Sequence, residues 1–145
     1  HQGRGGACRT HSSHSQNIHK DINMSDIQRH HSNARISKIV THGGLAYLSG
    51  QTAKGSAAAE AGIKEQTAEV LSRIDALLAE VGTNASRLLT VTIYLREIAD
   101  FAGMNAEWEA WLEENHATAP TRTTVEAALA TASLLVEMTA IAALA

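Results

Sequence analysis

The chain is organised around Ala119-Pro120-Thr121-Arg122-Thr123-Thr124-Val125, a stretch that holds its only proline and leads into a run of β-formers. Pro120 fixes its own backbone and restricts the residue before it to extended geometry, so it marks the start of a strand. A guanidinium does not deprotonate, so a buried arginine must be paired or must await an anion. We expect Arg122 either to grip a substrate carboxylate or to form a structural salt bridge, and the local pattern leaves both open.

Glu137 is the second unusual residue, because it stands inside the apolar run LLVEMTAI, residues 134–141. A carboxylate in such a strand is costly unless it is paired or used in chemistry. We expect Glu137 to move protons during catalysis. The alternatives are a carboxylate on a solvated strand face or a partner for Arg122. Glu126, on the strand after Arg122, is a further candidate.

Hydrophobic periodicity predicts the remaining elements. Strands are expected at residues 26–31, 37–41, 45–49, 88–95, 121–129 and 134–144, and amphipathic helices at 60–81 and 101–115. The pair Gly43-Gly44 predicts a hairpin, and Gly82 predicts the end of the first helix. Asp100 is a candidate cap for the second helix, and residues 52–59 are expected to form a loop.

The same periodicity predicts which side chains face the core. In the strand at 88–95 the predicted core face is Leu89, Val91, Ile93 and Leu95. In the second helix the predicted stripe is Phe101, Met104, Trp108, Trp111 and Leu112, with both tryptophans anchoring the helix to a sheet.

The element order predicts an α+β fold in which two helices cover one face of a sheet. The second face must then be solvated or buried against other subunits. The strand segments at 91–95 and 134–141 carry apolar or small residues on both faces, so we expect an oligomer.

Composition excludes several classes of function. The chain has 145 residues, 44% of them hydrophobic, and a net charge of -3, which offers no general attraction for nucleic acid or an anionic membrane. No apolar run is long enough to span a membrane, and no signal peptide is recognisable. We therefore expect a soluble cytoplasmic protein.

Residues 1–23 differ in composition from the rest of the chain, being rich in Gly, Ser, Arg and His. We interpret them as a disordered extension or an artificially added tail, and residues 24–145 as a single domain. Six of the eight histidines precede residue 32, but their spacing matches no zinc pattern and Cys8 has no partner cysteine. No native metal site is predicted.

Two further polar residues are candidates for a binding site. Asn105 lies on the second helix between Met104 and Trp108, and its amide would bond either a substrate or the backbone. Ser49 has no nearby His-Asp pair, so a catalytic triad is not supported. No phosphate loop or dinucleotide fingerprint is present, and we predict no cofactor.

Four motifs in order resemble the RidA/YjgF family of reactive-intermediate deaminases, also called the L-PSP endoribonuclease family. They are Leu48-Ser49-Gly50-Gln51, Asp100-Phe101-Ala102-Gly103-Met104-Asn105, Pro120-Thr121-Arg122-Thr123-Thr124-Val125, and Val136-Glu137-Met138 with Ala140-Ile141-Ala142. The resemblance covers residues 26–145. The sequence around Trp108-Glu109-Ala110-Trp111 is most similar to the YoaB-like branch.

The resemblance implies a chorismate-mutase-like domain that forms homotrimers, with a central barrel and clefts between subunits. It also implies hydrolysis of enamines and imines, such as 2-aminoacrylate, to 2-keto acids and ammonia. By the same resemblance, Arg122 would bind the substrate carboxylate and Glu137 would handle the attacking water. Ser49, Asn105 and Thr124 would line the cleft.

Two positions depart from the deaminase branch. Ile36 stands where that branch has a tyrosine, and Thr124 where it usually has a cysteine. If the tyrosine contacts substrate, its loss should change specificity or weaken deamination. Two other functions therefore stay open, namely a non-catalytic small-acid-binding or regulatory trimer and an endoribonuclease or translation inhibitor. The absence of a basic patch argues against the last.

Overall fold

The computed structural model describes residues 26–145. The predicted tail over residues 1–23, with Cys8 and four of the histidines, lies outside them. Within the described residues, no helix combines the length and the apolar character needed to cross a membrane.

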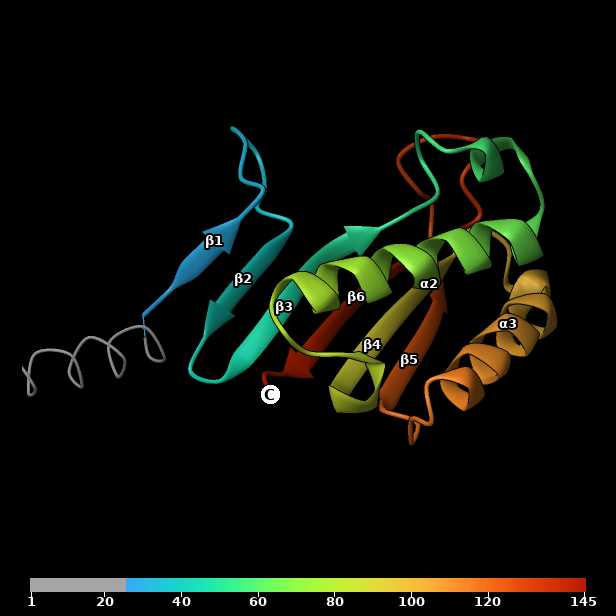
Figure 1. Ribbon diagram of the computed structural model, residues 1–145. Helices are drawn as coiled ribbons and strands as arrows, with labels where there is room; N and C mark the ends of the chain where they lie inside the picture. The colour runs from blue at the N-terminus through green and yellow to red at the C-terminus, as the bar shows by residue number, and fades with distance from the viewer. Residues whose placement is uncertain (1–25) are drawn as a thin grey trace, which may run out of the picture.

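Six strands form one mixed sheet in the order β1-β2-β3-β6-β4-β5. Their bounds are Gln28–His30 (β1), Ile39–His42 (β2), Leu45–Gln51 (β3), Leu88–Leu95 (β4), Thr121–Glu126 (β5) and Val136–Ala143 (β6). Strands β4 and β5 are parallel, and every other neighbouring pair is antiparallel. Strand β6 is the last in the chain, yet it lies between β3 and β4 (Figure 1).

Two α-helices connect strands β3, β4 and β5. Helix α2 (Ile63–Glu80) leads from β3 to β4, and helix α3 (Phe101–Glu114) leads from β4 to β5. Figure 1 shows both on the same side, with α2 across the middle of the sheet and α3 beside β5. The predicted α+β fold with two helices on one face is therefore confirmed.

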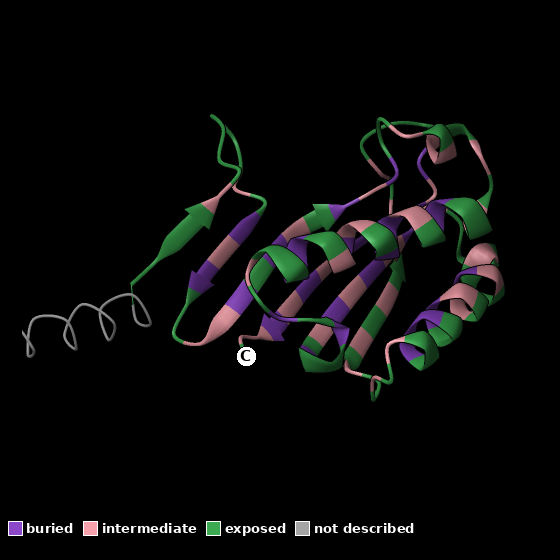
Figure 2. Cartoon of the chain, viewed as in Figure 1, coloured by how far each residue is buried: buried purple, intermediate pink, exposed green. Residues whose placement is uncertain are grey.

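The sheet has one buried face and one open face. Along β6 the buried residues Val136, Met138, Ala140 and Ala142 alternate with partly exposed ones, as a period of two requires (Figure 2). The core between this face and the helices contains Ile39, Leu48, Val70, Ile74, Leu78, Val91, Ile93, Leu95 and Met104. Neither helix covers the other face, where Tyr47 and Val125 are exposed.

The hairpin and the end of α2 form as the glycines predicted. Gly43 and Gly44 have φ of 59° and 82°, and a turn with two positive φ values suits the twist of paired strands. Gly82, with φ of 75°, follows the end of α2. These backbone conformations are ones that residues with a Cβ rarely adopt.

Several predictions about local structure were wrong. A bulge between Leu88 and Thr90 shifts the register, so Leu88 enters the core and Leu89 is 46% exposed. Asp100 precedes α3, but its side chain makes no capping hydrogen bond. Phe101 is 38% exposed instead of joining the core. Strand β5 also ends at Glu126, three residues earlier than expected.

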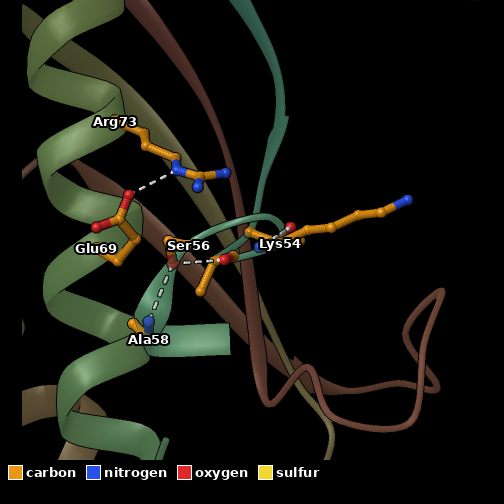
Figure 3. Close-up of polar contacts among 7 residues, drawn as sticks. Lys54, Ser56, Ala58, Glu69 and Arg73 are labelled. Carbon is orange, nitrogen blue, oxygen red and sulfur yellow. Dashed lines mark hydrogen bonds and ion pairs between the residues drawn. The ribbon is translucent and has the colours of Figure 1, made fainter. Parts of the chain in front are cut away.

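The predicted loop at 52–59 is partly ordered by a short 3-10 helix, Ala57–Glu60. The Ser56 hydroxyl donates to the carbonyl of Ala53 at 2.7 Å and accepts from the backbone N–H of Ala58 at 3.2 Å (Figure 3). Ser56 therefore acts as the N-cap of this turn, a role that its small polar side chain suits. The loop lies beside α2, whose Arg73 pairs with Glu69 in the same view.

Candidate functional site

Arg122 is held by three side chains of α3. Its Nη1 donates to Oδ1 of Asn105 at 2.6 Å. Its Cζ lies 5.5 Å from the ring centroid of Phe101 and 5.5 Å from that of Trp108, which is the range of cation–π attraction. We call Arg122, Asn105, Phe101 and Trp108 the clamp cluster. Among residues 26–145 Arg122 forms no salt bridge, so the structural ion pair that the sequence left open is not what holds it.

Thr124 lies two residues after Arg122 on β5. Its side chain therefore projects from the same face of the sheet as that of Arg122, because residues two apart on a strand share a face. Its Oγ1 is buried and has no hydrogen-bond partner within the described residues. Buried hydroxyls are normally paired, so this one has an unused donor and acceptor next to the clamp cluster.

Glu137 lines a pocket of about 440 Å³ with Gly50, Tyr94, Ala127, Ala128, Leu129 and Thr139. We call these seven residues the Glu137 pocket. Glu137 itself is partly exposed, so the strand places this carboxylate at a hollow on the open face of the sheet rather than in the core. A Cβ at position 50 would collide with the carboxyl group of Glu137, so any residue larger than glycine would displace this carboxyl from its present position.

Two polar side chains fix the segment that walls this pocket. Arg96 donates to the carbonyl of Leu134 at 2.8 Å from Nε, and from Nη2 to those of Thr131 at 2.6 Å and Leu129 at 3.3 Å. Gln66 is fully buried, donates to the carbonyl of Ser133 and accepts from the N–H of Leu135. The connection between β5 and β6 is thereby tied to β4 and α2.

The clamp cluster and the Glu137 pocket lie on opposite faces of one sheet. In the register of β4, Arg122 is beside Val91 and Glu137 is beside Tyr94. Val91 and Tyr94 are three residues apart, so they point to opposite faces, since strand side chains alternate. Val91 is buried under the helices, as is the face that carries Arg122. One chain therefore does not bring Arg122 and Glu137 together.

Ser49 joins neither the clamp cluster nor the Glu137 pocket within residues 26–145. It lies where the pairing of β3 with β6 shifts register, between Leu48 and Gln51. Its hydroxyl accepts from Nε2 of Gln51 at 3.3 Å. Its neighbour Gly50 reaches the Glu137 pocket, whereas Ser49 is not among the residues that line it.

Glu126 has a structural contact. Its Oε1 accepts from the backbone N–H of Ile98 at 2.9 Å, at the start of the turn that leads into α3. This bond satisfies one of the free N–H groups at a helical N-terminus. Trp111 likewise anchors α3, because its Nε1 donates to Asp75 of α2 at 3.0 Å.

Two other hollows contain charged residues. One of about 290 Å³ lies between α2 and α3 and includes Asp75, Glu107 and Glu114. The other, of about 220 Å³, includes Lys38 and Arg73. Across residues 26–145, no group of three or more His, Cys, Asp or Glu side chains is arranged to hold a metal ion.

The sequence reasoning missed the roles of Phe101 and Trp108 as neighbours of Arg122, and that of Arg96 at the pocket wall. A signal for the first was present, because Phe101, Asn105 and Trp108 follow each other at steps of four and three. That spacing places three side chains on one face of a helix. Nothing local in the sequence indicates the contacts of Arg96, which join segments more than 30 residues apart.

Comparisons with known proteins agree on the family. The family model described as Endoribonuclease L-PSP matches residues 27–144. A RutC family protein of Haemophilus influenzae is 42% identical over 116 residues, covering 80% of this chain and 97% of the relative. The RutC family protein YoaB of Escherichia coli is 40% identical over 110 residues, covering 76% and 91%.

A solved structure shows the same fold. The crystal structure of a member of the YjgF protein family from Neisseria meningitidis has a TM-score of 0.74 and 37% sequence identity, and the match covers 83% of this chain and 96% of that one. With the six-stranded sheet, the two helices and the family match, the predicted resemblance is confirmed, and the chain belongs to the endoribonuclease L-PSP family, which includes the RutC and YjgF proteins.

Proposed function

We propose that the protein is a hydrolytic deaminase of reactive enamines and imines, such as 2-aminoacrylate and its imine tautomer, that releases 2-keto acids and ammonia. The observation that carries the proposal is the state of Arg122. Its guanidinium is oriented by Asn105 and two aromatic rings, and it has no anionic partner among residues 26–145. Such an arginine suits a planar carboxylate, which it binds through two parallel hydrogen bonds.

The active site is proposed to form between two copies of the chain. A site that needs both Arg122 and Glu137 cannot be assembled on one sheet that carries them on opposite faces. Strand β5 is an edge strand and the open face has exposed Tyr47 and Val125, so both are available to a second copy. The homotrimer implied by the resemblance would place the clamp cluster of one copy next to the Glu137 pocket of the next.

The proposed reaction is a hydrolysis with Glu137 as the acid–base group. Glu137 accepts a proton from a water whose oxygen attacks the imine carbon, while the electron pair of the C=N bond moves to nitrogen. Glu137 returns this proton to the nitrogen, which gives the neutral carbinolamine. It then carries the proton of the hydroxyl group to the amino group, the C–N bond breaks with its electron pair on nitrogen, and ammonia leaves as the C=O bond of the keto acid forms. Arg122 holds the carboxylate throughout, and Thr124 supplies a hydroxyl beside it. Proton transfer of this kind contributes roughly 10²–10⁴-fold.

The experiment is to generate 2-aminoacrylate from serine with a dehydratase and to measure release of pyruvate and ammonia. The wild-type protein should accelerate it, and Arg122→Ala should not. A wild-type rate equal to that of buffer would reject deamination of this substrate. A panel of imines from several amino acids would then identify the preferred side chain.

Binding of a small acid without turnover is the second candidate, and Ile36 favours it. Ile36 is 48% exposed on a loop ordered by Asn33, whose Oδ1 accepts from the N–H groups of Arg35 and Ile36. An isoleucine offers no hydroxyl where the deaminase branch has a tyrosine. Calorimetry with 2-keto acids should then show Arg122-dependent binding while the deaminase assay shows none, and Ile36→Tyr should restore turnover.

A further inference from the structure

The face of α3 that meets Arg122 is built by three residues of one helical stripe. Phe101, Asn105 and Trp108 lie at steps of four and three, so they project from neighbouring turns of the same side. All three contact the guanidinium of Arg122 on β5, at 2.6 Å through Asn105 and at 5.5 Å from each ring centroid.

The two rings differ in how firmly they are held. Trp108 is 4% exposed and belongs to the core, and its ring lies 5.7 Å from that of Trp111. Phe101 is 38% exposed and is the more exposed of the two rings that contact the guanidinium. We call the side chains of Phe101, Asn105 and Trp108 together the cradle of Arg122. The Trp108 ring therefore has a fixed position, whereas the Phe101 ring can be changed with little effect on the core.

Asn105 forms a hydrogen bond with only one of the three nitrogens of the Arg122 guanidinium. A guanidinium has N–H groups on Nε, Nη1 and Nη2. Oδ1 of Asn105 accepts from Nη1, and within residues 26–145 neither Nε nor Nη2 makes a hydrogen bond. On the edge of the guanidinium formed by Nε and Nη2, both nitrogens are thus without a partner, whereas Nη1 has given one of its two N–H groups to Asn105.

We propose that Phe101, Asn105 and Trp108 are positioning residues that direct the Nε–Nη2 edge of Arg122 toward the substrate, so that its carboxylate binds side-on to this edge. The inference rests on the proposed role of Arg122 as the carboxylate clamp. An arginine side chain is flexible, and a ligand that must first order it binds more weakly. These three side chains order Arg122 before the ligand arrives, and the bond from Nη1 leaves Nε and Nη2 as the two nitrogens with no partner among residues 26–145.

The test uses the full chain labelled with ¹⁵N, and pyruvate as the probe. The Nε–H resonance of Arg122, assigned by its loss in Arg122→Lys, should already be displaced by the aromatic rings in the free protein. Phe101→Leu should move it toward the position of a solvated arginine, and Phe101→Tyr should return it. Saturating pyruvate should shift Nε–H strongly, because this group would donate directly to the carboxylate.

The affinity for pyruvate gives a second measurement. Phe101→Leu should weaken binding about 3- to 10-fold, as expected for one cation–π contact, and Phe101→Tyr should retain it. Ile98→Ala is the matched control, because it shortens a 48% exposed apolar side chain just before α3 that is not among the contacts of Arg122. In the deaminase assay Phe101→Leu should raise KM more than it lowers kcat, which a general loss of folded protein would not do.

Three results would overturn the inference. The first is an unchanged Nε–H position in Phe101→Leu. The second is a saturating pyruvate response that leaves Nε–H in place and shifts only the Nη groups, which would mean end-on binding. The third is an unaltered affinity in Phe101→Leu. If instead pyruvate binds equally to wild type and Arg122→Lys, the clamp role fails, whereas the resonance in the free protein still reports whether the cradle exists.

Discussion

The clamp cluster and the Glu137 pocket lie on opposite faces of one sheet, and they hold groups of opposite charge in different ways. The clamp cluster holds a permanent cation at the edge strand, and one helix supplies every group that fixes it. The Glu137 pocket presents a carboxylate above a glycine, and its wall is a connecting segment fixed by Arg96 and Gln66. In the proposed function, the chain separates recognition of an anion from acid–base chemistry, and a second copy joins the two.

The largest effect is expected from the clamp side. Arg122→Ala should lower kcat/KM on the order of 10²–10⁴-fold, because it removes two charge-assisted bonds of ~1.5–3 kcal/mol each. Coupled pyruvate detection measures it. Arg122→Lys is the control that keeps the charge and loses the fork, and it should recover only a small part. A kcat/KM of Arg122→Ala within a few-fold of the wild-type value would contradict the role of Arg122 in binding the substrate carboxylate.

The pocket side is tested by Glu137→Gln, which keeps the shape of the side chain. It should lower kcat by roughly 10²–10³-fold and leave KM nearly unchanged, since proton transfer is lost and carboxylate binding is retained. Steady-state kinetics with 2-aminoacrylate separates the two constants. An increase confined to KM would assign Glu137 to binding instead of catalysis.

Mixing the two inactive variants tests whether the faces meet between copies. Unfolded and refolded together in equal amounts, Arg122→Ala and Glu137→Gln should regain about a quarter of the wild-type activity if each site takes one residue from each neighbour. Each variant refolded alone is the control. A mixture as inactive as its parts would show that both residues act from the same chain.

A smaller effect is expected from Gly50→Ala, because the added methyl group would collide with the Glu137 carboxyl. Displacing this group should lower kcat about 10- to 100-fold. The free energy of unfolding should fall by less than about 1 kcal/mol, because the carboxyl is the end of a flexible side chain that can move aside. Gly62→Ala is the matched control, with an ordinary negative φ and its nearest neighbouring atom 3.9 Å away. Equal kinetics in the two variants would mean that the position of Glu137 is not critical.

Substitution of Arg96, which fixes the wall of the Glu137 pocket, should have a smaller effect on activity. Arg96→Met loses three hydrogen bonds to the β5–β6 connection, so KM should rise about 3- to 10-fold and the free energy of unfolding should fall by about 2–4 kcal/mol. Urea unfolding and kinetics measure the two changes. Arg73→Met, which removes only the pair with Glu69, should change stability by about 1 kcal/mol at most.

The smallest effect is expected at Glu126, whose carboxylate accepts from Ile98 and lies in neither group. Glu126→Ala should cost about 0.5–1 kcal/mol of stability, and Glu126→Gln, which keeps an acceptor oxygen, less than that. Both should retain kcat/KM within about twofold of wild type. A loss of activity without a loss of stability would reopen the catalytic interpretation of this residue.

Local sequence was enough to specify the elements and the buried face, because both depend on short-range periodicity and on backbone preferences. The alternation along β6, the positive-φ glycines and the stripe of α2 all follow from residues close together in the chain. Local pattern failed where a neighbour changed the outcome. The bulge exposes Leu89, and Phe101 lies outside the core with its ring against the guanidinium of Arg122.

Which candidate residues share a face was settled by the tertiary structure alone. The sequence identified Arg122, Asn105 and Glu137 as unusual, but it could not show that the first two touch while the third points away. That relation depends on β6 pairing between β3 and β4, a contact between segments distant in the chain. The side to which a strand residue points is local, whereas its neighbours are set by strand order and register, which the complete fold alone specifies.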